Sequence, residues 1–544
     1  MLAAGAVILL GLLAMRATFL GTVRAGDLSE RRAEHSRFPY ELPAERGAIQ
    51  SSDGADLAID RLAVDVTASP NLVTDPIAVA TRLAPILKRD ADTLANTLSE
   101  RGVYAVLARN VPPASADAAR DLGIPGIYFS DTYQRFLPGG PQAAQVLGLT
   151  GDEHEGLSGM EKQLDAELTG VSGRRVEVRD LFGRPIQVLS DREATPGVDV
   201  RLEVDSRIES EVERTLVETR ARFGAKSAMA IVMRPQDGAI LAMSTVPRFN
   251  PNQRRQINQD LERNRPVTDT FEPGSTFKIV TMTAALEDGK VTPRTTFDLP
   301  TSVTKYEGTP SEYTLVDDHR DVPERMTASE ILQRSSNIGT YTIGTRVGED
   351  RLKAWITRFG FGSVTGIDFP GEVAGNVQQD WSGTSELNIP IGYGTAVTLT
   401  QLARAYAAVA NGGTLVTPHL VAAVGGKNVT PPGRRIMHES TARSLSRMLR
   451  GVVDPRGTGS LAEVRGFQVA GKTGTAKKFD PTTGEYSDHL YTASFVGYAP
   501  ADDPQLLVAV VVDEPTGSYY GGDVAAPAFE RIAEFSLQTL RITP

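Results

Sequence analysis

Ser275-Thr276-Phe277-Lys278 follows Pro273-Gly274 and opens an apolar run with helical spacing, and this stretch decides how the chain is interpreted. A serine and a lysine three positions apart lie on the same face of a helix, one turn from each other. This spacing places an amine beside a hydroxyl without any histidine. A neutral lysine amine can remove the hydroxyl proton and make the serine a nucleophile. The stretch therefore indicates acyl transfer through a covalent ester of Ser275.

The Pro273-Gly274 step predicts that Ser275 stands at the beginning of the helix. Free backbone N–H groups and the positive end of the helix dipole favour a developing oxyanion there and disfavour a charged Lys278. The apolar periodicity of Thr276–Leu286 ends before Gly289, a suitable C-terminal cap. The alternative is a surface serine beside a surface lysine, without any chemical role.

A second copy of the pattern, Ser302-Val303-Thr304-Lys305, serves as an internal control. Its β-branched residues predict a strand. Side chains three positions apart in a strand point to opposite faces, so Ser302 and Lys305 are not expected to meet.

Ser335-Ser336-Asn337 is the second polar motif. Thr327-Ala328-Ser329-Glu330 fits a capping box and predicts a short helix that carries the motif at its C-terminal end. In a functional interpretation, Ser335 relays a proton to the leaving group and the Asn337 amide orients the substrate. In the alternative interpretation, Asn337 is only the polar end of that helix.

Lys472-Thr473-Gly474-Thr475 is the third motif, and Gln468-Val469-Ala470 leads into it as a predicted strand. A peptide substrate can pair with an exposed strand edge. Lys472 and the hydroxyls of Thr473 and Thr475 could then hold a carboxylate, and Gly474 would allow close approach of the backbone.

The same region formally matches a phosphate-binding loop, because residues 466–473 fit Gly-x4-Gly-Lys-Thr. That loop requires a preceding strand and a helix that opens at its end. Here the supposed loop is itself strand-like and Ala476–Tyr486 is rich in turns, so the nucleotide-binding hypothesis is disfavoured. No Gly-x-Ser-x-Gly elbow is present. Asp317-Asp318-His319 could belong to a metal site, but a charged turn is the preferred interpretation.

Composition narrows the functional classes. A chain of 544 residues is too long for one core, so two or more domains are expected. The net charge of −10 argues against nucleic acid as a partner. The absence of cysteine excludes disulfides, thiolate nucleophiles and cysteine-ligated zinc.

The N-terminus predicts a membrane anchor over residues 1–23. Leu2–Met15 is apolar or small and Ala17–Val23 nearly continues it, with Arg16 as the interruption. A span needs about 20 residues, so Arg16 would have to reach toward one membrane surface. The alternative is a signal peptide cleaved near Val23-Arg24-Ala25. In both cases the rest of the chain is expected outside the cytoplasm.

Two larger domains are predicted after the anchor, residues 24–226 and residues 227–544. The first mixes short strands and helices, and Val204–Phe223 closes it as a charged amphipathic helix. The second begins with a hairpin and continues with a mixture of helices and late strands, which predicts an α+β architecture with an antiparallel sheet covered by helices. The segments that carry this prediction are Ala228–Val232, Ile240–Met243, Thr400–Ala410, Leu506–Val512 and Ala525–Leu540.

Ser-x-x-Lys, Ser-x-Asn and Lys-Thr-Gly in this order are the signature of penicillin-recognising serine enzymes, and the chain resembles the class B penicillin-binding proteins. The resemblance is closest to the cell-division (septal) branch. It implies an elongated N-terminal pedestal, of the dimerisation-domain type, before a transpeptidase domain. The supporting stretches are Arg46–Ile49, Arg135–Gly148, Gly156–Glu161, Ile240–Met243, Pro247–Asn252, Arg263–Arg265, Thr268–Lys278, Gly392–Gly394, Ala405–Ala408 and Tyr519–Phe529.

The resemblance implies that the protein cross-links peptidoglycan as a D,D-transpeptidase. Ser275 would attack the penultimate D-alanine carbonyl of a stem peptide, with Lys278 as the base, and an amine from a neighbouring stem would resolve the acyl-enzyme. The other roles implied are proton relay for Ser335, substrate anchor for Asn337, carboxylate binding for Lys472, Thr473 and Thr475 beside Gly474, and an oxyanion hole from the backbone N–H groups of Ser275 and Thr475. β-Lactams would acylate Ser275, and no metal or organic cofactor is implied.

The resemblance also implies a place and partners for the protein. It would be a single-pass protein of the bacterial cell membrane with an extracytoplasmic catalytic domain. Its partners would be lipid-linked precursor, a membrane glycosyltransferase and division proteins.

Three alternatives stay open. A D,D-carboxypeptidase differs only in using water as the acceptor. A β-lactamase or antibiotic sensor shares the fold, although Thr384 stands where the class A deacylation loop has glutamate before Leu387-Asn388. A non-catalytic scaffold would not need Lys278 or Ser335. One departure from the class B pattern is present, since Ser51 and Ser52 replace an acidic-basic pair. No glycosyltransferase-like region precedes residue 226, which argues against the bifunctional class A type.

Overall fold

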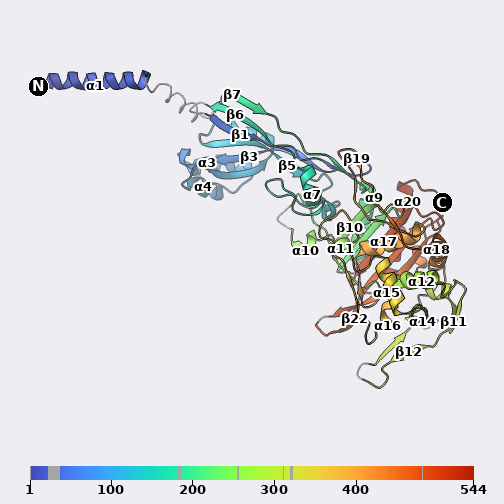
Figure 1. Ribbon diagram of the computed structural model, residues 1–544. Helices are drawn as coiled ribbons and strands as arrows, with labels where there is room; N and C mark the ends of the chain where they lie inside the picture. The colour runs from blue at the N-terminus through green and yellow to red at the C-terminus, as the bar shows by residue number, and fades with distance from the viewer. Residues whose placement is uncertain are drawn as a thin grey trace. The chain divides into compact units, whose positions relative to one another are not determined.

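The computed structural model describes residues 2–22, 37–179, 185–253, 257–309, 312–318, 323–480 and 482–544 (Figure 1). The chain divides into two compact units. Unit 1 comprises Met1–Gly47, Asp60–Phe136 and Glu167–Val198, and unit 2 comprises Ala48–Ile59, Leu137–Ala166 and Asp199–Pro544. Unit 2 therefore takes in three stretches before the predicted boundary, residues 48–59, 137–166 and 199–226, and the boundary between residues 226 and 227 stays a prediction.

The N-terminal segment forms helix α1 (Leu2–Thr22). Within the described part of the chain, no helix combines the length and the apolar character that crossing a membrane requires. The prediction of a transmembrane helix over residues 1–23 is therefore not confirmed; Arg16 interrupts the apolar run of α1. The alternative cleavage point at Val23-Arg24-Ala25 lies outside the described residues.

Unit 1 contains a small helix-covered sheet and a separate three-stranded sheet. In the first, β3 pairs with β4 and β5, and buried leucines of α3 and α4 pack with apolar residues of β3 and β4. The second sheet has the order β1-β6-β7. The bounds are β1 (Arg37–Leu42), β3 (Asp56–Ala68), α3 (Pro76–Leu87), α4 (Ala91–Ser99), β4 (Ala105–Val111), α5 (Pro113–Arg120), β5 (Ile127–Phe136), β6 (Gly173–Arg179) and β7 (Pro185–Arg192).

Unit 2 is built on a five-stranded antiparallel sheet with the order β10-β9-β23-β22-β21. Its strands are β9 (Ser227–Met233), β10 (Ile240–Val246), β21 (Ala470–Asp480), β22 (Glu485–Ala499) and β23 (Leu506–Asp513). The predicted hairpin at the start of the domain and the predicted late strands are therefore confirmed. The first hairpin and the last three strands, far apart in sequence, meet where β9 pairs with β23.

Helices cover both faces of this sheet. On one face, α9 (Ser206–Arg222) and α20 (Ala526–Thr539) share a core with Ala230, Val232 and Val510. On the other face, the sheet packs against α17 (Leu399–Ala410), which contacts β9, β22 and β23. Every residue of β9 and β10 is buried because a sheet covered on both faces has no solvent side. The α+β architecture predicted from the sequence is confirmed.

The remaining elements of unit 2 are helices beside the sheet and short paired strands. The helices are α6 (Ala144–Leu147), α7 (Gly159–Gln163), α10 (Gln259–Glu262), α11 (Arg265–Thr268), α12 (Lys278–Glu287), α13 (Ala328–Gln333), α14 (Asn337–Val347), α15 (Glu349–Arg358), α16 (Ser385–Asn388), α18 (Glu439–Val453) and α19 (Gly521–Val524), with 3-10 turns η3 (Gly274–Phe277), η4 (Ile389–Ile391) and η5 (Ser460–Ala462). The strands are β2 (Ile49–Gln50), β8 (Val200–Leu202), β11 (Thr296–Asp298), β12 (Ser302–Lys305), β13 (Tyr313–Val316), β14 (Arg325–Thr327), β15 (Asn376–Val377), β16 (Thr395–Ala396), β17 (Thr414–Leu415), β18 (Val421–Val424), β19 (Lys427–Asn428) and β20 (Arg434–Arg435). Two short elements fall outside this grouping, η1 (Pro70–Leu72) in unit 1 and α8 (Asp165–Leu168) at a unit boundary.

Candidate active site

The candidate nucleophile lies on a 3-10 turn rather than on the first turn of an α-helix. Ser275 belongs to η3, and α12 begins at Lys278. In a 3-10 helix the side chains at positions i and i+3 eclipse each other, so this turn aligns Ser275 with Lys278. Gly274 has a φ of +51°, and a Cβ atom on Gly392 would lie 2.1 Å from the Gly274 carbonyl oxygen. Tight packing of these two glycines therefore holds the turn in place.

Lys278 is fully buried and its amine is held by the second motif. Nζ donates to the backbone oxygen of Ser335 at 2.6 Å, to Ser335 Oγ at 3.2 Å and to Asn337 Oδ1 at 2.7 Å. Burial lowers the pKa of Lys278 to about 8, while Asp318 and Asp317 act in the opposite direction. A substantial fraction of neutral amine is therefore available near neutral pH.

The second motif joins two helices. The capping box of Thr327 and Glu330 starts α13, as predicted. The prediction that this helix carries the motif at its C-terminal end is only partly right, because Ser335 adopts a φ of +59° just after α13 and Ser336 caps the N-terminus of the next helix, α14. Gly339 N donates to Ser336 Oγ at 2.9 Å. Asn337 is the first residue of α14, so its interpretation as the polar end of a helix is wrong.

Asp317 is a supporting residue that the sequence did not reveal. Its carboxylate accepts hydrogen bonds from Ser336 Oγ at 2.9 Å, from Ile338 N at 3.1 Å and from Asn337 N. A carboxylate at a helix N-terminus is favoured by the free N–H groups and the helix dipole. Asp317 thus fixes the turn that presents Ser335 and Asn337 to Lys278.

The metal alternative at Asp317-Asp318-His319 gains no support. His319 lies outside the described residues. Among the residues that the structure describes, no group of three or more histidine, aspartate or glutamate side chains could hold a metal ion.

The third motif lies on β21, as predicted. Lys472 is fully buried, and Nζ donates to Thr473 O at 3.2 Å and Thr473 Oγ1 at 3.4 Å. Burial, and next the positive charge of Lys278, lower the pKa of Lys472 well below its ordinary value. Thr475 Oγ1 accepts a hydrogen bond from Gly521 N at 3.0 Å.

Gly474 shows the close backbone approach that its sequence position predicted. A Cβ atom there would lie 2.3 Å from Ser494 Oγ and 2.9 Å from Thr276 Cγ2. Any side chain at this position would push β21 away from the nucleophile turn.

The phosphate-loop hypothesis is wrong, because β21 continues as a strand from Ala470 to Asp480, where that motif requires a helix to open.

Thr384 precedes α16, and Asn388 Nδ2 donates to its hydroxyl at 3.0 Å. Thr384 is not among the residues that line the Ser275 cavity, so its correspondence to the class A deacylating glutamate rests on the sequence pattern before Leu387-Asn388.

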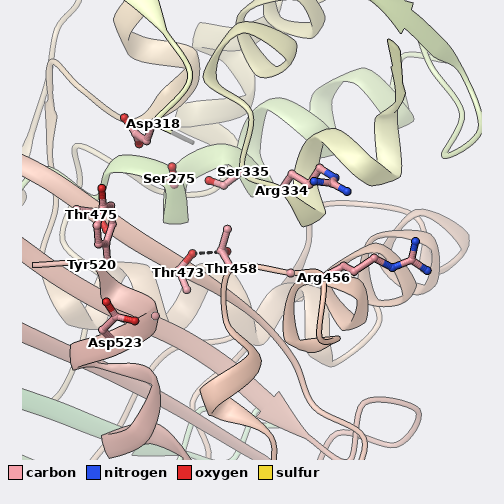
Figure 2. Close-up of a pocket in the computed structure, with 12 residues that line it drawn as sticks. Ser275, Asp318, Arg334, Ser335, Arg456, Thr458, Thr473, Thr475, Tyr520 and Asp523 are labelled. Carbon is pink, nitrogen blue, oxygen red and sulfur yellow. Dashed lines mark hydrogen bonds between the residues drawn. The ribbon is translucent and has the colours of Figure 1, made fainter. Parts of the chain in front are cut away.

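A cavity of about 370 Å³ brings the three motifs together (Figure 2). It is lined by Ser275, Asp318, Arg334, Ser335, Arg456, Gly457, Thr458, Thr473, Thr475, Tyr520, Gly522 and Asp523. Four of the eight predicted site residues line it directly. The other four, Lys278, Asn337, Lys472 and Gly474, are buried beneath it. The structure therefore gathers all eight predicted residues into one site, and their individual roles stay predictions.

The sequence missed several cavity-lining residues. Thr458 shares a hydrogen bond of 2.7 Å with the Thr473 hydroxyl. Tyr520 belongs to a row of aromatic rings, in which Tyr519 stacks on Tyr491 with centroids 4.1 Å apart and lies 4.5 Å from Tyr520. Thr458 carries no local pattern, whereas Tyr520 lies in the Tyr519–Phe529 stretch that supports the family resemblance; only the fold brings the two residues to the Ser275 cavity.

A buried lysine beside a cavity-lining serine, on helices that flank an antiparallel sheet, defines a serine acyltransferase of the penicillin-binding class. Residues 228–534 match the penicillin binding protein transpeptidase domain, and residues 41–202 match the penicillin-binding protein dimerisation domain. The chain belongs to the penicillin-binding protein transpeptidase family. The resemblance inferred from the motifs is thereby confirmed.

Relatives and solved structures agree with this assignment. The chain is 34% identical over 548 residues to the probable peptidoglycan D,D-transpeptidase PenA of Neisseria meningitidis, covering 99% of this chain and 92% of that protein. It is 34% identical over 450 residues to the peptidoglycan D,D-transpeptidase FtsI of Escherichia coli, covering 82% and 74%. Penicillin binding protein 3 of Mycobacterium tuberculosis, solved in complex with aztreonam, superposes with a TM-score of 0.72 at 29% identity, covering 93% of this chain and 98% of that one.

Proposed function

We propose that this enzyme cross-links the peptide stems of peptidoglycan through an acyl-enzyme on Ser275. The observation that carries the proposal is the buried Lys278 amine, held by Ser335 and Asn337 next to the cavity that Ser275 lines. The similarity to proteins named as peptidoglycan D,D-transpeptidases supports the choice of substrate.

In the first half-reaction, neutral Lys278 takes the Ser275 proton as Oγ attacks the penultimate D-alanine carbonyl. The C–N bond to the terminal D-alanine then breaks, and the proton passes to that nitrogen through the Ser335 hydroxyl, which lies 3.2 Å from Lys278 Nζ. Backbone N–H groups of Ser275 and Thr475 stabilise the oxyanion, a kind of donor worth about 3–4 kcal/mol of barrier.

The rest of the site holds the substrate in this scheme. Lys472, Thr473 and Thr475 bind the terminal carboxylate, and Asn337 anchors the peptide. In the second half-reaction an amine of a neighbouring stem attacks the ester and releases Ser275.

β-Lactams are expected to acylate the same serine. A solved relative is described in complex with aztreonam. Because Thr384 stands where a deacylating glutamate would be needed, the adduct on Ser275 is expected to be long-lived.

The cellular role is proposed from relatives. Similarity to FtsI favours septal wall synthesis, with division proteins and a membrane glycosyltransferase as partners. A 34% identical relative named stage V sporulation protein D leaves a second candidate role. We place the catalytic domain at residues 227–544, outside the cytoplasmic membrane where lipid-linked precursor is polymerised, and residues 24–226 as a supporting domain.

The experiment that tests the function supplies lipid-linked precursor and a glycan polymerase to the purified full chain, followed by mass spectrometry of the digested product. Cross-linked dimers from the wild type, and none from Ser275→Ala, are expected. Shortened stems without dimers would instead make the enzyme a carboxypeptidase. Arrest at the septum on depletion tests the division role.

A further inference from the structure

Positively and negatively charged side chains lie at different ends of the cavity that Ser275 lines. Arg334 and Arg456 lie at one end of the cavity, and the carboxylates of Asp318 and Asp523 lie toward the other (Figure 2). Thr458 and Thr473 lie below Ser275 in this view, between the two ends. A substrate that carries a positive charge would therefore meet attraction at one end and repulsion at the other.

Asp318 differs from the neighbouring carboxylates in the contacts that it makes with the described residues. Asp317 is occupied by Ser336 and the start of α14, and Asp523 accepts a hydrogen bond from Ser518 Oγ at 2.9 Å. Within the described part of the chain, no hydrogen bond or ion pair engages the Asp318 carboxylate. It is exposed at the cavity wall, and it is close enough to the buried amines to counter the burial effect on the pKa of Lys278 and of Lys472.

The second half-reaction needs a partner of the matching charge. The acyl group on Ser275 is transferred to an amine, and a primary alkyl amine is mostly an ammonium ion at neutral pH. The terminal D-alanine has left with its carboxylate by then, so the groups assigned to that carboxylate, Lys472 and its threonines, offer an ammonium ion no negatively charged partner.

We propose that Asp318 binds the ammonium group of the acceptor and so fixes the end of the cavity from which aminolysis occurs. This inference rests on the proposed transpeptidase function. Arg334 and Arg456 disfavour a cationic acceptor at the opposite end. Asp318 is thereby the residue that makes a cationic amine, rather than water, the preferred acceptor.

The chemical step that follows is balanced within the site. The bound ammonium first releases one proton to solvent. The neutral nitrogen then forms a C–N bond to the acyl carbon as the C–O bond to Ser275 Oγ breaks. The nitrogen loses its second proton to neutral Lys278, which returns it to Ser275 Oγ. Asp318 stays ionised throughout and forms no covalent bond.

The experiment measures how the acyl-enzyme partitions between an amine and water. Full-length enzyme is acylated by an N-acyl-D-alanyl thioester, and aminolysis and hydrolysis products are quantified with D-alaninamide as a cationic acceptor. Asp318→Asn is expected to lower the aminolysis-to-hydrolysis ratio about five-fold, the effect of one unit charge at about 4 Å in a water-like medium. The same variant is expected to leave the ratio unchanged with hydroxylamine, which is largely uncharged at pH 7.5.

Asp298→Asn is the matched control, because its carboxylate is exposed and does not line the cavity; it is expected to leave both ratios unchanged. An Asp318→Asn ratio for D-alaninamide equal to that of the wild type would overturn the inference. An equal fall for both acceptors would also overturn it, since that result indicates general damage to the site. If the wild type does not turn over the thioester at all, the proposed function itself fails, whereas hydrolysis with unaltered partitioning defeats only the role of Asp318.

Discussion

Unit 2 contains two Ser-x-x-Lys sequences that have the same spacing but lie in different secondary structures. Ser275 and Lys278 lie on a 3-10 turn that runs into α12, whereas Ser302 and Lys305 lie at the two ends of strand β12. In the hairpin with β13, Ser302 pairs with Val316 and Lys305 with Tyr313, so the serine and the lysine stay apart.

The surroundings of the two lysine amines, and therefore their pKa values, also differ. The Lys278 amine is buried against Ser335 and Asn337, and its pKa falls to about 8. The Lys305 amine forms an ion pair with Glu386 at the surface, and the hydrogen bond to Glu386 raises its pKa. A four-residue pattern therefore becomes a candidate catalytic pair only where the helical turn aligns the two side chains and burial lowers the pKa of the amine.

The largest expected difference between the two copies is in acylation by penicillin. Ser275→Ala removes the only hydroxyl proposed to attack, so labelling by a fluorescent penicillin should disappear from the gel. Ser302→Ala is the matched control and should label like the wild type. Labelling that survives in the Ser275 variant at an unchanged melting temperature would place the nucleophile elsewhere.

Replacing each lysine should distinguish the two Ser-x-x-Lys copies, in the rate of acylation, almost as strongly as replacing each serine. Lys278→Met retains bulk and an apolar fit in the buried site but removes the base, so the acylation rate constant should fall about 10²–10⁴-fold, measured by stopped-flow or intact-mass time courses. Lys305→Met should remain within about two-fold of the wild type, because the charge lost there is at the surface. Similar losses in both variants would argue against Lys278 as the base.

The pH dependence of acylation should also distinguish the role of Lys278 from that of Lys305. In the proposed mechanism the neutral amine of Lys278 is the base, and its pKa of about 8 means that this form increases as pH rises. The acylation rate should therefore climb about ten-fold per unit at acidic pH and level off above pH 8, giving about a 30-fold rise from pH 6.5 to 9. Lys305→Met should show the same profile as the wild type. A flat profile between pH 6.5 and 9 would contradict the assignment of a lysine base.

A smaller effect is expected from the residue that positions the second motif. Asp317→Ala removes the carboxylate that accepts from Ser336 and Ile338, so the turn carrying Ser335 should loosen. Acylation should slow about ten-fold, less than the roughly 10²–10⁴-fold cost of losing a general acid or base outright, while the folded state persists. Asp298→Ala, on exposed β11, is the control and should have no effect. Unchanged acylation in the Asp317 variant would show that the turn holds its shape without it.

Much of unit 2 was predictable because its signals are local. Thr327 and Glu330 form the expected capping box, Gly289 follows the end of α12, and the apolar run at Leu506–Asp513 is a buried strand. Each of these rests on chemistry within a few residues, which the sequence displays directly.

The features that were missed depend on contacts between distant segments. Asp317 precedes the helix it caps by 20 residues and reaches it only because the β12–β13 hairpin folds beside α14. The positive φ of Ser335 comes from the sharp passage between two helices, and no residue type in the motif requires it. Tyr520 and Thr458 line the cavity from loops that follow Ser275 by more than 180 residues.

The sequence by itself determined which functional groups are available: four hydroxyls, two amines and an amide at spacings that suit acyl transfer, on segments whose periodicity specifies helix or strand. Only the tertiary structure decided that Ser275 lines a cavity and in which direction the pKa of each lysine is shifted. It alone also placed the Asp317 carboxylate at the N-terminus of α14. The reason is physical: helix and strand preference arises from neighbouring residues, whereas burial and electrostatic surroundings arise from groups brought together from the whole chain.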